Sequence, residues 1–254
     1  MKPDNSLYNN PRVAAAYAYA RPAVHPGVLQ RVREHLRLNT PVVRALDVGC
    51  GAGRSTAALT GFADHVVGID PAALMMEHRR SVAPHASFVV GQAESLPFSD
   101  AAFNLITAAG SLNYVDRRLA LPEIGRVLSR GGTFVIYDFS DGRRLGAGAL
   151  LEEWFTQFER RYPSVPGYDM DVRRIPFGVA GLELKAYLEL DIPIPMTLDS
   201  YLRYVMSETR IELARSSGVE ETSIREWCRL TLEDIFDDEP RDVIFDAYAA
   251  CIGR

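Results

Sequence analysis

The stretch Ala45-Leu46-Asp47-Val48-Gly49-Cys50-Gly51-Ala52-Gly53-Arg54 decides how this chain folds. The run 42–48, apolar except for Arg44 and Asp47, predicts a buried strand of a parallel sheet. Three glycines at alternate positions follow, and residues 55–59 then begin a helix. Glycine is needed where the backbone turns sharply against a ligand, because a Cβ there would clash. The stretch therefore predicts a strand, a glycine loop and a helix that hold a nucleotide-like molecule at the carboxyl edge of a sheet.

The loop lacks two common phosphate-binding patterns. A Walker loop needs Gly-Lys-Ser/Thr after its last glycine, whereas Gly53 is followed by Arg54 and Ser55. The dinucleotide pattern G-x-G-x-x-G needs its third glycine at position 54. Asp47, just before the loop, would repel a pyrophosphate and suits a cation. A ligand with an ammonium and a sulfonium and no phosphate, S-adenosylmethionine (SAM), fits these residues; the alternative is an ordinary strand-to-helix turn.

The acid–x–Gly–x–Gly–x–Gly pattern of Asp47, Gly49, Gly51 and Gly53 resembles motif I of class I SAM-dependent methyltransferases. With motifs described below, the resemblance covers roughly residues 13–140 and is strongest to the small-molecule group of UbiE and the trans-aconitate methyltransferases (methyltransferase type 11). It implies that these four residues and Cys50 bind the cofactor.

Composition is that of an ordinary soluble globular protein. A chain of 254 residues is long enough for one α/β domain with additions, or for two small domains. The net charge of −5 gives no electrostatic case for a nucleic-acid partner. Three distant cysteines, Cys50, Cys228 and Cys251, indicate neither a metal site nor a disulfide framework. No apolar run approaches the ~20 residues of a membrane span, and the start is polar, so we expect a cytoplasmic protein without a membrane partner, either a monomer or a homodimer.

A second short strand, 65–70, ends in Asp70. An acid about twenty residues past a glycine loop, at a strand end, can accept hydrogen bonds from both ribose hydroxyls. Alternatively, Asp70 caps a helix that starts at Pro71. Met75 lies on the apolar face that follows; methionine there is typical of core filling, although in this family the segment after the second strand, with Pro71 and Met75, lies near the adenine.

Two further strands end in loops that the resemblance assigns to the site. After the strand 87–90, residues 91–98 resemble the family's G-D-A-E-x-L-P-F stretch, which implies that Gln92, Ala93 and Glu94 border the adenine. An amide at position 92 can donate to and accept from the adenine edge. After the strand 102–107, family members place this loop beside the sulfonium and the acceptor. The loop begins with Ala108 and Ala109, assigned to the cofactor, and contains Asn113 and Tyr114, which either border the acceptor or cap and pack the next helix.

The N-terminal segment is expected to be helical and to close over the ligands. Residues 19–26 resemble the Tyr-x-x-x-R-P-x-Y-P segment that precedes motif I in small-molecule methyltransferases, which assigns Tyr19 and Arg21 to the cofactor. Tyr17 is expected only to pack. His25 stands where an aromatic residue is usual, and is a candidate for acceptor binding or deprotonation.

The remaining sequence predicts the architecture. Residues 121–138 resemble the family's E-x-x-R-V-L-x-P-G-G followed by a strand. Later segments predict an amphipathic helix at 150–161, a strand at 182–190, helices near 198–214 and 223–236, and a last strand at 243–252. We expect an α/β fold: a doubly wound, mostly parallel, seven-stranded Rossmann-like sheet with an antiparallel last strand. Its parts would be an N-terminal helical cap (1–40), a SAM-binding core (41–140), and lid helices with the late strands (141–254).

The resulting hypothesis is methyl transfer from SAM to a small molecule by in-line displacement, at an oxygen or nitrogen of a hydroxyl or carboxylate compound, with release of S-adenosylhomocysteine (SAH) and no metal. An acidic acceptor could pair with an arginine, the candidates being Arg12, Arg21, Arg143 and Arg144. Two alternatives stay open: a non-catalytic SAM- or SAH-binding protein, and an NAD-dependent oxidoreductase of similar fold.

Overall fold

The computed structural model of the chain describes residues 10–146, 148–164, 170–236 and 239–254. Nine α-helices and eight strands lie within these ranges, besides short 3-10 helices. The helices are α1 (Pro11–Tyr19), α2 (Val24–Leu36), α3 (Arg54–Leu59), α4 (Arg79–Val82), α5 (Arg117–Val127), α6 (Leu150–Arg161), α7 (Leu198–Val205), α8 (Thr209–Ser216) and α9 (Glu221–Leu232). The strands are β1 (Val42–Val48), β2 (Ala63–Asp70), β3 (Ser87–Val90), β4 (Phe103–Ala109), β5 (Leu128–Phe139), β6 (Arg144–Leu145), β7 (Glu183–Met196) and β8 (Arg241–Gly253).

The strands form one mostly parallel sheet in the order β3-β2-β1-β4-β5-β8-β6, with β7 also pairing with β8. Among the described strands, β8 alone runs antiparallel to its neighbours β5, β6 and β7. The predicted α/β fold with an antiparallel last strand is therefore confirmed. The sheet has eight strands rather than seven, because the two-residue β6 pairs with β8.

Both faces of the sheet are covered, as in a doubly wound fold. Along β5, Phe134 and Ile136 pack in a cluster with α5, whereas Val135 and Tyr137 pack in another cluster with α2. This alternation follows from the two-residue period of a strand. The N-terminal residues thus form a structural layer on the sheet, in which α2 begins at Val24.

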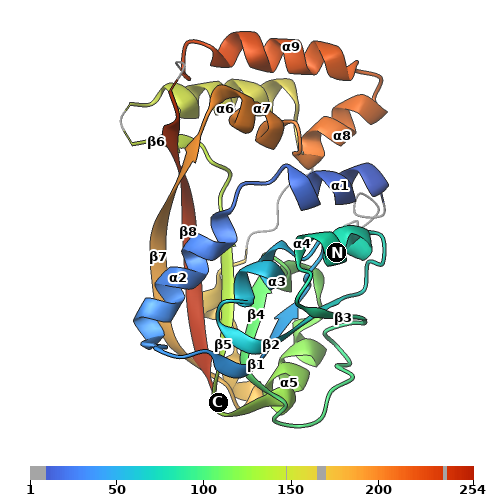
Figure 1. Ribbon diagram of the computed structural model, residues 1–254, viewed down its shortest axis with the longest axis vertical. Coiled ribbons are helices and arrows are strands. Elements are labelled where there is room, and N and C mark those ends of the chain that lie inside the picture. The colour runs from blue at the N-terminus through green and yellow to red at the C-terminus, as the bar shows by residue number, and fades with distance from the viewer. Residues whose placement is uncertain (1–9, 147, 165–169, 237–238) are drawn as a thin grey trace.

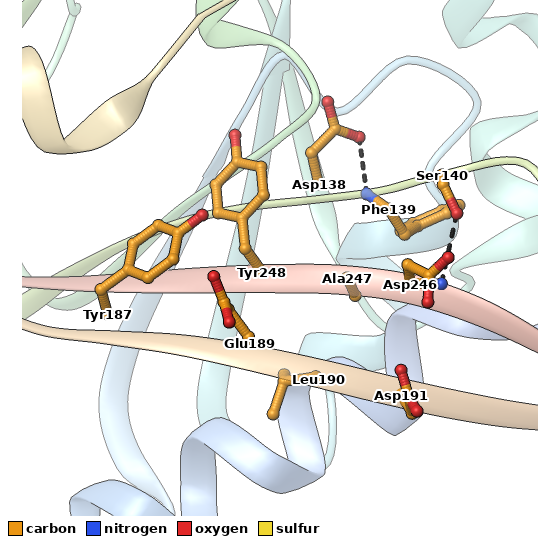
Figure 2. A pocket seen from close by; sticks show the side chains of 10 residues that line it. All are labelled: Asp138, Phe139, Ser140, Tyr187, Glu189, Leu190, Asp191, Asp246, Ala247 and Tyr248. Carbon is orange, nitrogen blue, oxygen red and sulfur yellow. Dashed lines mark hydrogen bonds between the residues drawn. The ribbon is translucent and has the colours of Figure 1, made fainter.

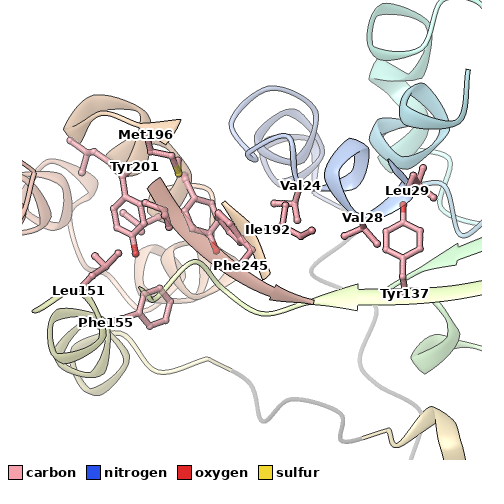
Figure 3. Close-up of a cluster of buried hydrophobic side chains, with 14 of the residues drawn as sticks. Val24, Val28, Leu29, Tyr137, Leu151, Phe155, Ile192, Met196, Tyr201 and Phe245 are labelled. Carbon is pink, nitrogen blue, oxygen red and sulfur yellow. The ribbon is translucent and has the colours of Figure 1, made fainter. Parts of the chain in front are cut away.

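Strands β7 and β8 are long and extend beyond the parallel core to the helices α6–α9, which we call the upper helical layer (Figure 1). Aromatic side chains fill the interior of this layer: Trp154 stacks on Phe158 at 5.1 Å, and Tyr201 stacks on Phe236 at 4.9 Å. These residues belong to the same buried cluster as α2 and the sheet, part of which Figure 3 shows. The layer is therefore packed onto the sheet as one continuous core.

Several predicted boundaries are wrong. The predicted strand 182–190 runs on to Met196 and includes Pro193 and Pro195, which it tolerates because β7 pairs on one side only. The predicted helix 198–214 is two helices, α7 and α8. No α-helix starts at Pro71; a 3-10 turn over Met75–His78 leads into α4.

Candidate active site

The glycine loop joins β1 to α3 at the carboxyl edge of the sheet. Gly49, Gly51 and Gly53 have φ of +73°, +48° and +92°, a region that L-residues other than glycine rarely adopt. A Cβ added to Gly49 would lie 2.7 Å from the Oγ of Ser111, in the loop after β4. The Ser111 hydroxyl itself donates to the Val48 carbonyl at 2.6 Å. The loop is therefore held in a conformation that favours glycine, and it lies tight against the loop after β4.

Asp47 lies beneath this loop, fully buried, and does not line the pocket. Its Oδ2 accepts from the hydroxyls of Ser55 at 2.6 Å and Thr56 at 2.7 Å, and its Oδ1 accepts from Thr107 at 2.9 Å. Burial raises the pKa of Asp47, and the three hydroxyl donors only partly offset it. The expectation that this carboxylate meets a bound cation is not what the geometry shows: three hydroxyls occupy it, and it ties β1, α3 and β4 together.

Asp70, at the end of β2, connects the loop to the following turn. Its Oδ2 accepts from the Gly51 N–H at 2.9 Å and its Oδ1 from the Ala72 N–H at 2.7 Å. Burial raises the pKa of Asp70, and both N–H donors oppose the rise. Asp70 also lines the pocket, and each oxygen retains a lone pair for a further donor. The capping and ribose interpretations of this residue are therefore compatible.

A pocket of about 610 Å³ opens in front of the glycine loop. This volume is in the range of small-molecule sites in proteins, which span about 300–1,000 Å³. Segments at the ends of five strands, β1 to β5, border it together with the N-terminal helices and part of the upper helical layer. The sequence-predicted site residues that line it are Arg21, His25, Gly49, Cys50, Gly51, Asp70, Pro71, Met75, Gln92, Ala93, Glu94, Ala109, Asn113 and Tyr114.

Three other predicted residues, besides Asp47, do not line the pocket. Tyr19 is 61% exposed, and its hydroxyl contacts Ser81 at 2.7 Å. Tyr17, expected only to pack, lines the pocket instead, because two positions along a helix turn a side chain to a different face. Gly53 caps α3, and Ala108 is buried in the core on the opposite side of β4 from Ala109.

The pocket contains two side chains that indicate what it can bind: Asn113, after β4, and Glu94, after β3. The Oδ1 of Asn113 is buried and has no hydrogen-bond partner among the described residues. Glu94 accepts from the Asp116 N–H at 2.8 Å through Oε1. A buried acceptor without a donor is stabilised by a ligand or water that supplies one. Together with the carboxylate of Asp70 and the amide of Gln92, the pocket offers the acceptors that a nucleoside requires.

The N-terminal segment is fastened over the glycine loop. Arg54, in the first turn of α3, donates to the Ala18 carbonyl at 3.1 Å and to the Pro22 carbonyl at 3.0 Å. On the same segment Val13 and Ala14 pack against Met75. Figure 1 shows α1 between the core and the upper helical layer. These contacts confine the pocket on the side away from the sheet.

The sequence reasoning missed the residues at the other end of the pocket, which come from β5 and the upper helical layer. Glu208 accepts from Arg21 at 2.5 Å, and the Arg21 guanidinium lies 4.5 Å from the ring centre of Tyr17. Asp138 is the second-last residue of β5; a Cβ built on Gly110 would lie 3.0 Å from its Oδ1. No short-range pattern marks Glu208, whereas the position of Asp138 at a predicted strand end was a usable signal.

Asp138 and His25 differ in their protonation. Burial, with a smaller contribution from Asp141, raises the pKa of Asp138 to about 6, so this carboxylate is ionised at neutral pH and close to its titration. Burial and the nearby Arg54 lower the pKa of His25 to about 3. The neutral ring contacts the Tyr137 hydroxyl through Nδ1 at 3.0 Å.

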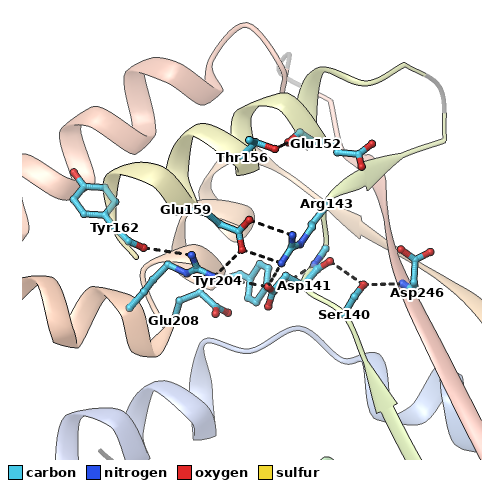
Figure 4. Close-up of polar contacts among 12 residues, drawn as sticks. Ser140, Asp141, Arg143, Glu152, Thr156, Glu159, Tyr162, Tyr204, Glu208 and Asp246 are labelled. Carbon is cyan, nitrogen blue, oxygen red and sulfur yellow. Dashed lines mark hydrogen bonds and ion pairs between the residues drawn. The ribbon is translucent and has the colours of Figure 1, made fainter. Parts of the chain in front are cut away.

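An ion network joins the loop after β5 to the upper helical layer. Arg143 donates to Asp141 at 2.9 Å and to Glu159 at 3.0 Å (Figure 4). Arg210 donates to the same Glu159 at 3.2 Å. Arg210 also donates to the Tyr162 carbonyl. The network fixes α6 and α8 relative to the strand end that carries Asp138.

Comparison with known proteins agrees with this geometry. Residues 46–136 match the methyltransferase domain family. This segment of the chain is a methyltransferase domain. The chain is 30% identical over 131 residues to an uncharacterised methyltransferase of Mycobacterium tuberculosis, with 52% of each chain covered. It is 42% identical over 101 residues to a demethylmenaquinone methyltransferase of Clavibacter sepedonicus, covering 38% of this chain and 41% of that one.

The chain thus spans about half the length, or less, of these curated relatives. A solved structure from Anaeromyxobacter dehalogenans, described as a candidate type II methyltransferase, superposes with a TM-score of 0.71 at 20% identity, over 92% of this chain and 97% of that one. This likeness extends the shared fold beyond the methyltransferase domain to the late strands and the upper helical layer.

The described residues contain neither a candidate membrane span nor a candidate metal site. None of their helices is both long and apolar enough to span a bilayer. In the same residues, no group of three or more His, Cys, Asp or Glu side chains is placed to hold a metal ion.

Proposed function

We propose that this protein binds SAM in the pocket in front of the glycine loop and transfers its methyl group to a small-molecule acceptor. The observation that carries the proposal is the convergence of the Gly49–Gly53 loop, Asp70 and residues 91–94 on one pocket, within the methyltransferase domain. Bound SAM would supply an electrophilic methyl group on a sulfonium, already activated for displacement.

In this proposal the cofactor residues have separate roles. Asp70 accepts from the ribose hydroxyls while it holds the glycine loop through Gly51. Gln92, Ala93 and Glu94 border the adenine, and Asn113 faces the reactive end with its unpartnered Oδ1. Asp47 acts indirectly, by fixing the loop from below.

The protein's contribution to the reaction would be mostly alignment and exclusion of water. The N-terminal segment fastened by Arg54 and the upper helical layer provide the enclosure. Where the acceptor carries a proton at neutral pH, Asp138 is the proposed residue to take it, because its carboxylate is ionised there. His25 is a weak base with a pKa of about 3, and we propose that it positions Tyr137 instead.

The alternatives are less well supported. A non-catalytic SAM-binding protein would need no acceptor space, whereas the pocket continues past the glycine loop to Asp138 and Glu208. An NAD-dependent oxidoreductase would need a glycine at position 54, where Arg54 fastens the N-terminal segment. A small-molecule acceptor, a cytoplasmic location, no nucleic-acid partner and a monomeric or homodimeric state remain part of the proposal.

The site is tested by SAH affinity in matched aspartate variants. Asp70→Ala should weaken SAH binding at least about fivefold, the equivalent of one ordinary hydrogen bond. Asp64→Ala removes an exposed aspartate from the same strand and should leave the affinity unchanged. Equal SAH affinity in the two folded variants would remove Asp70 from the site.

A further inference from the structure

A second cavity, of about 820 Å³, lies on one face of β5, β8 and β7. On these three neighbouring strands, Asp138 of β5 lies opposite Tyr248 of β8, and Tyr248 lies opposite Glu189 of β7. Figure 2 shows their side chains on the same side of the sheet, with Tyr187 beside them. The intervening Leu190 packs on the other, apolar face. The sequence thus alternates so that polar and tyrosine side chains line this cavity.

The second cavity adjoins the pocket proposed for SAM. Asp138, Phe139 and Ser140, the end of β5 and the residue after it, line both. Asp138 also lies against Gly110, in the loop after β4 that borders the SAM pocket. A molecule in the second cavity would therefore reach the proposed reaction centre at the Asp138 carboxylate.

The charge of the second cavity is negative. Its lining contains four carboxylates and no lysine or arginine. Arg144, at its margin, pairs with two of them, Asp191 and Asp246. No ion pair joins Asp138 or Glu189 to a cation within the described part of the chain. Asp138 accepts a hydrogen bond from its own neighbour, from the Phe139 N–H to Oδ1 at 2.9 Å.

The arginines that an acidic acceptor would need are already engaged with protein carboxylates. The pairs are Arg12 with Glu221, Arg21 with Glu208, Arg143 with Asp141 and Arg144 with Asp246. Arg54, which lines the SAM pocket, donates to two backbone carbonyls. An anionic acceptor would therefore have to displace existing contacts, whereas a cation would find carboxylates in place.

Aromatic surface complements these charges. The rings of Tyr187 and Tyr248 stack with their centres 5.6 Å apart and their planes 13° from parallel. Tyrosine rings give both apolar contact and attraction for a cation. Arg173, which pairs with Asp171, already lies 4.9 Å from the ring centre of Tyr187, so a ligand cation would share this aromatic surface with it.

We propose that the second cavity is the acceptor site and that the acceptor is a cation, a protonated amine, with its charged group held by Glu189 and Asp138 and its carbon skeleton against Tyr187 and Tyr248. For transfer, the Asp138 carboxylate takes one proton from the ammonium group. The freed nitrogen lone pair forms the new N–C bond as the S–C bond of SAM breaks, so that SAH leaves and the product is a methylated ammonium. This inference rests on the proposed methyl transfer and names the class of molecule that receives the methyl group.

The test measures binding of three probes of one shape and different charge: 2-phenylethylamine, 2-phenylethanol and phenylacetate, titrated at pH 8 into protein saturated with SAH. We expect the amine to bind at least about tenfold more tightly than the alcohol or the acid. Absence of amine binding at millimolar concentration, or equal or tighter binding of either of the others, would overturn the proposal.

Two matched variants locate the binding. Glu189→Gln should weaken amine binding at least about fivefold. Glu183→Gln, on the same strand but with its carboxylate paired to Lys185, should not change it. An unchanged amine affinity in Glu189→Gln would place the amine elsewhere and contradict the assignment of this cavity.

The same titrations separate the two proposals. If SAH does not bind, the proposed function fails, and the amine series on ligand-free protein still tests the cavity. If SAH binds and the amine shows no preference, the acceptor assignment alone fails.

Discussion

Asp47 shows how a residue that a motif assigns to a ligand can act from beneath the site. The aspartate is recognisable in the sequence because the glycine pattern follows it, yet its three hydroxyl partners come from two different elements. Thr107 lies 60 residues further along the chain, and no local pattern announces that contact. The position of Asp47 was therefore predictable, whereas its contacts were not.

Replacing this carboxylate should destabilise the fold as well as the site. Asp47→Ala leaves three buried hydroxyls without their acceptor, and we expect a loss of about 3 kcal/mol in the free energy of unfolding. Asp47→Asn keeps one oxygen acceptor and should lose less. Urea denaturation of both variants measures this; a loss below about 1 kcal/mol in Asp47→Ala would show that the network contributes little.

His25 should make stability depend on pH. Because its pKa is lowered to about 3 in the folded protein, the unfolded state binds a proton first as the pH falls below about 6.5. The stability that neutral His25 contributes is therefore complete above pH 6.5 and is lost as the pH falls toward 3.

The measurement is the difference in unfolding free energy between the wild type and His25→Gln from pH 7 to pH 4.5. As the pH falls below about 6.5, the wild type should lose stability relative to His25→Gln by up to about 1.4 kcal/mol per pH unit. Asp138, whose raised pKa acts in the opposite direction between about pH 4 and 6, is present in both proteins, so the comparison isolates His25. If the unfolding free energies of the two proteins changed with pH in parallel, His25 would not have the lowered pKa.

At the scale of elements, the N-terminal segment depends on contacts that the sequence did not reveal. The alanine-rich stretch predicts a helix, and α1 is one, but its place over the glycine loop comes from Arg54 and from packing on Met75. Arg54 was noted in the sequence only as a residue that excludes two phosphate motifs. Its actual partners are backbone carbonyls, which carry no side-chain signature.

Removing Arg54 should loosen this segment. Arg54→Ala loses two charge-assisted hydrogen bonds, and we expect backbone amides in residues 11–22 to exchange about tenfold faster, with weaker SAH binding. Arg12→Ala, which removes a pair whose arginine side chain is 58% exposed, is the control and should change exchange little. Equal exchange in the two variants would mean that α1 is held by packing alone.

At the scale of the whole molecule, the doubly wound sheet could be predicted because buried strands and their following loops recur in order along residues 42–138. The upper helical layer was predicted only as separate helices. Its packing depends on long-range aromatic contacts, such as Trp154 with Trp227, between segments that are adjacent only after folding. The proposed acceptor end was the least predictable part, because β5, β7, β8 and the start of α8 each contribute to it.

The central claim is that the pocket in front of the glycine loop binds SAM, and a calorimetric titration of the purified protein with SAM, SAH and NAD tests it most directly. We expect micromolar binding of SAM and SAH, no binding of NAD, and loss of both adenosyl ligands in Gly51→Val, whose side chain would demand a backbone conformation that valine disfavours. Binding of NAD alone, or unchanged SAM affinity in a folded Gly51→Val protein, would contradict the account.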